Sequence, residues 1–360
     1  MADFHLFNPE NDLALGIGCR NYTPPPHAAA LHHAGALLPM WWANPGDRIL
    51  APESLSECAG KLRAEFGING EIGFDHSVSK LTPWGWSLDA KRQFVTAGAT
   101  SDSNKQLILP TDNEIERMRQ LSHRRTSIEI LRALDYPLQL PVEATDADTV
   151  VKMEAKAPGC FVKSPWSCSG RGVFNAMTLD EGTLRKRVEG IINRQGSVMV
   201  EHGLNKTMDF AALFFSDGNY VKFCGLSMFQ ALNRGMYTGN IVASQPEIRR
   251  LLSSHLDLDN LDRLLVNLEA VLTAIATPYY RGWMGVDMMT HVYNGKEQIM
   301  PCVELNLRMT MGVVAMKMHE RLDISHPMLL NWEHNTSPAH NDITLLPPIE
   351  GFALRLKEIK

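Results

Sequence analysis

The sequence lacks long apolar runs, an excess of positive charge and any sign of a leader segment. Its 360 residues carry 35 Lys and Arg against 40 Asp and Glu, a formal net charge of -5. A protein of this charge has no broad basic field to attract nucleic acid. No run of about eighteen apolar residues is present to cross a bilayer, and the N-terminus lacks the basic and apolar regions of a signal peptide. We therefore expect a cytoplasmic protein that binds neither nucleic acid nor membrane.

Several motifs of known chemistry are also missing. The six cysteines form no C-x-x-C pair of the kind found in zinc sites, and they are too sparse for a disulfide scaffold, so we expect reduced thiols. The phosphate-binding patterns G-x-x-x-x-G-K-[ST] and G-x-G-x-x-G are absent. No convincing Ser-His-Asp or Cys-His arrangement is present either. The sequence thus gives no support for a P-loop enzyme, a dinucleotide-binding enzyme or a triad hydrolase.

With 44% hydrophobic residues, the chain can form buried cores in two or three domains. The apolar run 4–7 predicts a first β-strand that ends in the polar loop 8–12. In open α/β sheets such loops line the ligand crevice. Asn8, Glu10 and Asp12 are therefore candidate substrate residues, although ordinary turn chemistry explains the same residues.

A helix is predicted over 114–134 from the spacing of its apolar positions. This segment also carries a cluster of arginines. A solvated helix face is one explanation of the cluster. The other is that Arg124 or Arg125 reaches a polyphosphate.

The segment 161–173 combines a lysine with a loop of small residues. Lys163 ends a short apolar strand and supplies a point charge suited to phosphate. The following Ser169-Gly170-Arg171-Gly172 can bring backbone N–H groups close to phosphate oxygens. A plain hairpin turn is the alternative interpretation.

Further along, the strand predicted at 197–200 ends at Glu201, where the backbone can pass beside a purine ring. Asp209 would then be available for ribose hydroxyls. The glycine-punctuated loop 233–240 resembles an active-site flap, and its Arg234 is a candidate for phosphate or a substrate carboxylate, unless the loop is an ordinary surface connection.

The strands predicted at 286–290 and 300–305 are joined by a turn at Asn294-Gly295. Because side chains alternate along a strand, Asp287, Glu304 and Asn306 can point to one face. Two carboxylates and an amide oxygen suit Mg²⁺. Arg308 follows two residues after Asn306 and would stand beside the metal. A solvated strand end carrying ordinary charges is the alternative.

Taken in order, these motifs resemble the ATP-grasp superfamily of carboxylate–amine or carboxylate–thiol ligases, with no subfamily assigned. The resemblance covers roughly residues 115–320. It depends most on Lys163 with its glycine loop, and on Asp287 with the Glu304-x-Asn306-x-Arg308 run. It implies two α+β subdomains that grip ATP, preceded by an N-terminal Rossmann-like α/β domain.

The resemblance also implies roles for individual residues. ATP would be bound by Arg125, Lys163, Ser169, Gly170, Arg171, Gly172, Glu201 and Asp209. Mg²⁺ would be bound by Asp287, Glu304 and Asn306. Arg308 and Arg234 would neutralise charge during catalysis. Where many members have a first phosphate-contacting lysine, this chain offers only Arg124 and Arg125.

The domain limits we predict are 1–112 for the N-terminal domain, 113–198 for the small grasp subdomain and 199–360 for the large one. The implied reaction activates a carboxylate as an acyl-phosphate for attack by an amine, releasing ADP and phosphate. Its substrates would be small molecules or peptides, and a homodimer is one arrangement left open. The alternatives are a regulatory ATP-binding protein without turnover and a phosphotransferase that uses the same ATP site.

Overall fold

The computed structural model describes residues 2–101, 107–168, 170, 172–231, 237–277 and 279–359. The chain divides into two compact units. The first contains residues 1–118, 238–244 and 308–360, and the second contains residues 119–237 and 245–307. The limits 1–112, 113–198 and 199–360 stay a prediction. In the division found here, residues 308–360 are grouped with residues 1–118.

The first unit begins with a parallel four-stranded sheet in the order β3-β2-β1-β4. Its strands are β1 (Ala2–Leu6), β2 (Arg48–Ile49), β3 (Glu71–Ile72) and β4 (Val78–Pro83). Phe4 and Leu6 of β1 are buried in one core with Phe94, which confirms the predicted first strand. A parallel sheet agrees with the predicted α/β character, whereas the assignment to a Rossmann-like domain stays a prediction.

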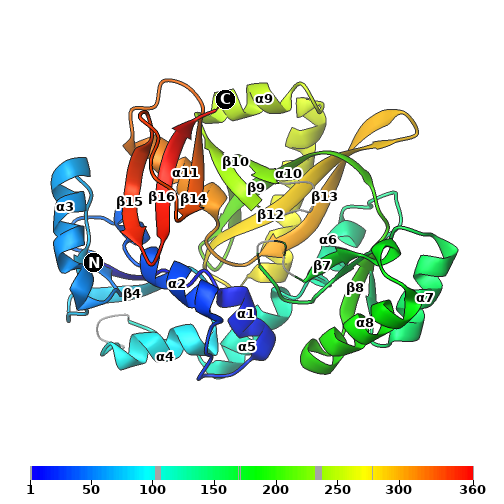
Figure 1. Ribbon diagram of the computed structural model, residues 1–360, viewed down its shortest axis with the longest axis horizontal. Coiled ribbons are helices and arrows are strands. Elements are labelled where there is room, and N and C mark those ends of the chain that lie inside the picture. The colour runs from blue at the N-terminus through cyan, green and yellow to red at the C-terminus, as the bar shows by residue number, and fades with distance from the viewer. Residues whose placement is uncertain are drawn as a thin grey trace. The chain divides into compact units, whose positions relative to one another are not determined.

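Helices connect these strands and continue the first unit (Figure 1). They are α1 (Asn11–Ile17), α2 (Pro26–Ala34), α3 (Ser56–Phe66), α4 (Leu88–Thr96), α5 (Asp112–Leu121) and α11 (Met311–Arg321). The helix α4 begins with a true N-cap, since the Ser87 side chain accepts a hydrogen bond from the Ala90 backbone N–H. Gly67 ends α3 in the left-handed conformation, with φ of 63°.

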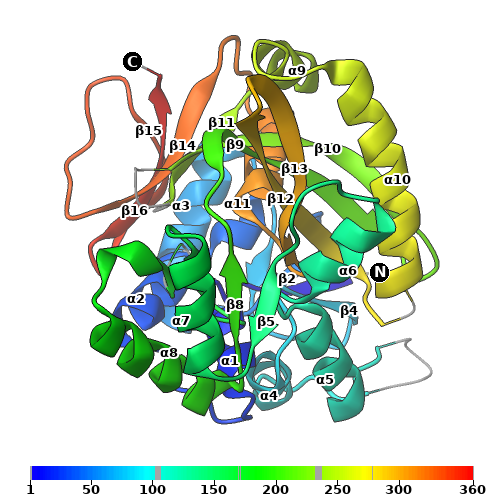
Figure 2. The same ribbon diagram turned by 90° about the vertical axis from the view of Figure 1, so that its right-hand side faces the viewer.

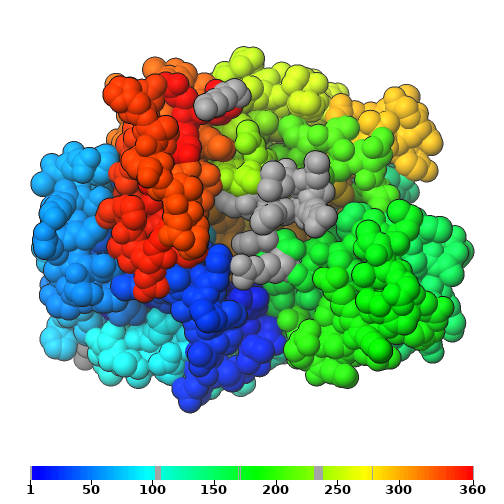
Figure 3. All heavy atoms as spheres, viewed as in Figure 1, coloured from blue at the N-terminus to red at the C-terminus, as the bar shows by residue number. Residues whose placement is uncertain are grey.

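The C-terminal part of the first unit is antiparallel, with its strands in the order β11-β14-β16-β15. The strands are β11 (Tyr237–Val242), β14 (Met328–His334), β15 (Ile343–Ile349) and β16 (Phe352–Glu358). Phe7 stacks on Trp332 with ring centroids 6.2 Å apart, and His27 meets Phe352 edge-on at 5.1 Å. Figure 3 shows the red and orange C-terminal residues lying directly against the blue N-terminal ones.

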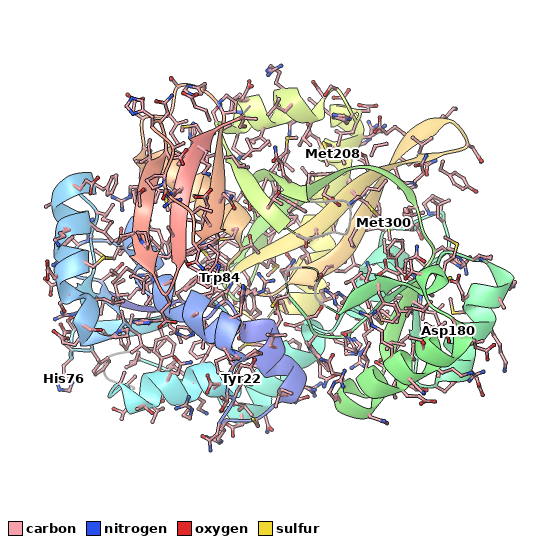
Figure 4. All side chains as sticks on the ribbon, viewed as in Figure 1. Tyr22, His76, Trp84, Asp180, Met208 and Met300 are labelled. Carbon is pink, nitrogen blue, oxygen red and sulfur yellow. The ribbon has the colours of Figure 1, made fainter. Side chains whose placement is uncertain are left out.

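In the second unit a small antiparallel sheet has the order β5-β8-β6-β7, and α7 and α8 pack together beside it (Figure 2). The elements are β5 (Val142–Ala144), α7 (Ala147–Lys156), β6 (Phe161–Lys163), β7 (Val173–Asn175), α8 (Glu181–Gln195) and β8 (Val198–Glu201). Val150, Val162, Val188 and Val200 are buried in their common core. Asp180, labelled in Figure 4, caps α8 by accepting a hydrogen bond from the Thr183 backbone N–H.

The remaining strands of the second unit run in the order β13-β12-β9-β10. Its other elements are α6 (Thr126–Ala133), β9 (Asn205–Ser216), β10 (Val221–Ala231), α9 (Gln245–Leu252), α10 (Leu258–Ala276), β12 (Gly282–Tyr293) and β13 (Lys296–Asn306). The β12–β13 hairpin turns at Asn294 and Gly295, both with positive φ, as predicted. Its strands lie side by side in Figure 1, and Figure 4 labels Met300 on β13.

The single helix predicted over 114–134 is wrong. Two helices, α5 and α6, are separated by a turn at 122–125. The backbone N–H of Arg124 donates to the carbonyl of Pro165, and the N–H of Arg125 donates to Nδ1 of His123. These bonds replace the helical ones and interrupt the helix.

The whole is a mixed α/β fold. Among the helices that the structure describes, none combines the length and apolar character needed to cross a membrane.

The C-terminal strands contain one buried charge cluster. The Arg355 side chain is 1% exposed and the Glu333 side chain 8%. Arg355 donates to Glu333 and, at 3.0 Å, to Oγ1 of Thr336. Burial raises the pKa of Glu333, but hydrogen bonds from Lys357, Thr336 and Arg355 outweigh it and leave this pKa below its ordinary value.

Replacing Glu333 with alanine should lower the free energy of unfolding by about 3–5 kcal/mol, because it leaves the Arg355 guanidinium buried without a counter-charge. Urea denaturation of both proteins measures the difference. The double variant Glu333→Leu, Arg355→Met removes both charges and should lose less than Glu333→Ala alone. Equal losses in the single and double variants would contradict the pairing.

Candidate active site

The predicted metal ligands lie at one end of the β12–β13 hairpin in the second unit. Asp287 is the direct cross-strand partner of Glu304, and Gly285 is the partner of Asn306. Directly opposed residues point to the same face of a sheet. Asn306 is buried, with 6% exposed, and the Glu304 side chain is 20% exposed. The two carboxylates predicted for Mg²⁺ are therefore neighbours on one sheet face.

The predicted phosphate lysine and the predicted adenine-hinge residue form an ion pair. Lys163 ends β6 and Glu201 ends β8, which are adjacent strands. Lys163 Nζ lies 2.5 Å from Glu201 Oε2, and these side chains are only 11% and 12% exposed. Two charges predicted separately from the sequence are thus joined in a nearly buried pair.

The loop after Lys163 is a hairpin between β6 and β7. Ser164 N–H donates to the carbonyl of Gly172 at 2.8 Å, which closes its base. Gly170 and Gly172 both adopt left-handed backbone conformations, with φ of 73° and 76°, where only glycine is unstrained. Ser169 and Arg171 lie outside the described residues, so their predicted roles stay predictions.

Trp166 fixes the first half of this hairpin. Its backbone N–H and carbonyl both bond to the Gln195 side chain, at 3.0 and 3.1 Å. Its indole N–H donates to the Arg119 carbonyl, and the Arg119 guanidinium lies 4.0 Å from the ring centroid. The hairpin base is thereby held to the end of α8 and to the segment before Arg124.

Arg124 connects this hairpin with Glu304, one of the predicted metal ligands. Its side chain is 5% exposed. Its Nη1 donates to the Ser164 carbonyl at 2.6 Å and to Ser167 Oγ at 2.8 Å, and its Nη2 donates to Glu304 Oε2 at 2.8 Å. One guanidinium thus contacts both the residues following Lys163 and a carboxylate of the predicted metal site.

Arg125, which we predicted as the ATP ligand, has different partners. Its guanidinium bonds to Gln120 and lies 3.4 Å from Glu143 Oε1. The structure therefore places Arg124, not Arg125, beside the β6–β7 hairpin. The sequence could not show which of the two arginines lies beside the hairpin. Their directions depend on the turn at 122–125, which we predicted as part of a helix.

A buried thiol shows that these groups converge. Burial, followed by the negative charges of Asp287, Glu304 and Glu201, raises the pKa of Cys302, while the positive charge of Lys163 lowers it. Cys302 lies on β13, two residues before Glu304. All four charged residues lie near enough to this sulfur atom to affect its pKa, so they are grouped in one part of the second unit.

Asp209, predicted for the ribose, lies on β9 and pairs with Lys206 at 2.5 Å. Its side chain is 22% exposed. Arg234 lies outside the described residues, and its role stays a prediction.

The other predicted residues belong to the first unit. Arg308 pairs with Asp12, with Nε and Oδ2 2.8 Å apart. Asn8 bonds through its amide to both backbone groups of Gly85, at 2.9 and 3.3 Å, so it joins the loops that follow β1 and β4. Glu10 pairs with His32 at 2.8 Å.

The donor set at Asp287, Glu304 and Asn306 suits a hard cation, since all of its atoms are carboxylate or amide oxygens. No group of three or more His, Cys, Asp and Glu side chains that could hold a metal was found in the described part of the chain. The predicted set has two carboxylates and an amide, so it is not a group of that kind. Mg²⁺ commonly takes few protein ligands and completes its shell with phosphate and water.

No family model and no curated protein sequence matches this chain. Solved structures resemble it. Biotin carboxylase from Campylobacter jejuni, in a β-γ-ATP complex, has a TM-score of 0.52 at 12% identity over 98% of this chain and 86% of that one. N5-carboxyaminoimidazole ribonucleotide synthetase from Thermus thermophilus has a TM-score of 0.53 at 11% identity, covering 99% and 93%.

The biotin carboxylase domain of 2-oxoglutarate carboxylase from Hydrogenobacter thermophilus, in complex with MgADP, ADP and bicarbonate, has a TM-score of 0.50 at 12% identity and covers 82% of both chains. Identities this low show the fold alone. The chain has an ATP-grasp fold, as the sequence resemblance implied.

Gly172→Ala should lower the free energy of unfolding more than Gly159→Ala. Both glycines have positive φ, 76° and 96°, so alanine is strained at both. A Cβ at Gly172 would lie 2.6 Å from Ser164 Oγ, whereas nothing lies within 4 Å of one at Gly159. We expect an additional loss of about 1–2 kcal/mol at Gly172 from crowding, measured by urea denaturation. Equal losses at the two positions would contradict this account of the hairpin.

His123 should make stability depend on pH. Burial, followed by the charge of Arg125, lowers its pKa to about 4. Between the unfolded value of about 6.5 and this folded value, the unfolded chain binds the proton more strongly. The free energy of unfolding should therefore fall as pH drops from 6.5 to 4.

Urea denaturation at pH 7.5, 6 and 5 measures this dependence. The variant His123→Gln lacks the ionisable ring and should show a shallower slope over the same interval. An identical slope in both proteins would contradict a buried neutral imidazole.

Proposed function

We propose that the protein is an ATP- and Mg²⁺-dependent ligase. It activates a carboxylate as an acyl-phosphate, an amine attacks this intermediate, and ADP and phosphate leave. The observation that carries the proposal is the set of hydrogen bonds from Arg124, which contacts the hairpin after Lys163 and the carboxylate of Glu304. The phosphate-binding and metal-binding motifs predicted from distant parts of the sequence thus lie beside each other in one unit.

The similar structures support the nucleotide part of the proposal. One of them is complexed with MgADP and another with a β-γ-ATP ligand. Their fold is the one found here, so a nucleotide site between the phosphate hairpin and the carboxylate strands is a reasonable transfer to this chain.

The roles follow from charge and geometry. Lys163 provides a point charge for phosphate, and the hairpin 164–172 provides backbone N–H donors. Asp287, Glu304 and Asn306 would hold Mg²⁺, which neutralises charge on phosphate oxygens when bound. Arg124 fixes both the hairpin base and the orientation of Glu304. Positioning and charge neutralisation are what phosphoryl transfer requires from a protein.

Glu304→Gln tests the proposal most directly. The amide oxygen can still accept the Arg124 hydrogen bond, so the fold should persist, while the charge for Mg²⁺ is lost. We expect ADP release with the best carboxylate and amine pair to fall by about 100-fold or more at a temperature where the variant is fully folded. The melting temperature should fall as well, because the buried Arg124 guanidinium loses its counter-charge. Glu297→Gln, at the far end of the same strand, should leave the rate unchanged.

The wild-type screen itself can contradict the proposal. A protein that binds ATP yet releases no ADP with any carboxylate and amine pair would be a nucleotide-binding regulator. A stable phosphate ester, identified by mass spectrometry of the product, would show a phosphotransferase. Equal activity of Glu304→Gln and wild type would remove Glu304 from the metal site.

A further inference from the structure

The first unit contains a pocket of about 630 Å³. One wall includes Glu10 and Leu50, which lie just beyond the carboxyl ends of β1 and β2, and Asp89 in α4, the helix that follows β4. The other wall includes α2, and Tyr22, labelled in Figure 4, precedes that helix. In parallel sheets the crevice at the carboxyl ends of the strands is where ligands bind. The pocket thus occupies a favoured position for a ligand in its own sheet.

Glu10 lines this pocket and carries an unsatisfied oxygen. The residue is 4% exposed. Its Oε1 bonds to His32 Nδ1 at 2.8 Å, whereas its Oε2 is buried and has no hydrogen-bond partner in the part of the chain that is described. A buried carboxylate oxygen without a donor is costly, by about 1–3 kcal/mol or more. A donor supplied by a ligand would remove this cost.

The other charges of the pocket are already paired. Asp89 Oδ1 accepts hydrogen bonds from Arg92 at 3.0 and 2.6 Å, and its Oδ2 accepts one from Gln93 at 2.8 Å. His32 already contacts Glu10 Oε1 at 2.8 Å, so Oε2 is the oxygen of this carboxyl group that a ligand donor can still use. A carboxylate oxygen can only accept a hydrogen bond, so the complementary ligand group is a donor, and a cationic N–H donor forms the stronger bond.

Much of the remaining lining is apolar. It comprises Pro24, Ala29, Ala36, Leu50, Ala51 and Pro52. Such a wall favours carbon chains, since it offers apolar surface and few hydrogen-bonding side chains.

We propose that this pocket binds a small primary amine, with its ammonium group donating to Glu10 Oε2 and its carbon chain against the apolar wall. The ligase proposed above consumes an amine, so we assign this compound class to its amine substrate. That assignment rests on the proposed function, whereas the binding of an amine does not.

The test compares n-butylamine, n-butanol and butyrate, which carry the same carbon chain with different head groups. Methyl NMR spectra of the full chain report binding through Ala29, Leu50 and Ala51. We expect saturable shifts of these methyls with butylammonium, which should bind at least about tenfold more tightly than butanol, and no shifts with butyrate. Equal binding of the amine and the alcohol would overturn the proposal without any variant.

Glu10→Gln should weaken butylammonium binding by about tenfold and leave butanol binding unchanged. Glu57→Gln, on the exposed face of α3, is the matched control and should change neither. Undiminished amine binding in Glu10→Gln would overturn the role of Glu10.

Activity measurements separate the two proposals. Wild-type protein that binds butylammonium in this pocket but never releases ADP would retain the amine site and overturn the ligase. An active ligase whose KM for its amine is the same in Glu10→Gln as in wild type would retain the ligase and overturn the assignment of its amine to this pocket.

Discussion

The arrangement of the candidate site depends on one buried guanidinium. Arg124 is almost inaccessible to water, so its charge must be neutralised within the protein, and Glu304 does this at 2.8 Å. The same group also bonds to Ser164 and Ser167. Loss of the bond to Glu304 or of the bonds to Ser164 and Ser167 would leave a buried charge or polar group unsatisfied. These bonds therefore hold the β6–β7 hairpin beside the end of β13. The hairpin that follows Lys163 and the Glu304 carboxylate are thereby fixed relative to each other.

Local signals predicted much of the fold around this group. The alternation of side chains along each strand and the Asn294-Gly295 turn were sufficient to predict the β12–β13 hairpin, since both are properties of neighbouring residues in the sequence. The break between α5 and α6 had no such signal, because 122–125 contains neither glycine nor proline. The break results from a hydrogen bond between the Arg124 backbone N–H and the Pro165 carbonyl. This contact joins residues far apart in the sequence, so the spacing of apolar residues within the helix cannot predict it. The grouping of 308–360 with the N-terminal residues is equally non-local.

The site was predictable to a similar extent. The neighbouring positions of Asp287 and Glu304 followed from strand register, and Lys163 was identified from its place at a strand end. Which of Arg124 and Arg125 contacts the β6–β7 hairpin could be seen only from the geometry of the turn at 122–125. Glu10 could be named because it follows β1, but its pocket is formed by segments after β2 and β4 and by α2. No spacing in the sequence brings those segments together.

Cys302 indicates the kind of chemistry that this site can perform. Burial and the carboxylates of Asp287, Glu304 and Glu201 raise the pKa of its thiol, and the opposing effect of Lys163 does not cancel theirs. At neutral pH the sulfur stays protonated and is a poor nucleophile. The carboxylates that add to the effect of burial on this thiol are those that would hold a divalent cation in the proposed site. In the proposed ligase, these residues would therefore contribute charge placement rather than covalent attack by this thiol.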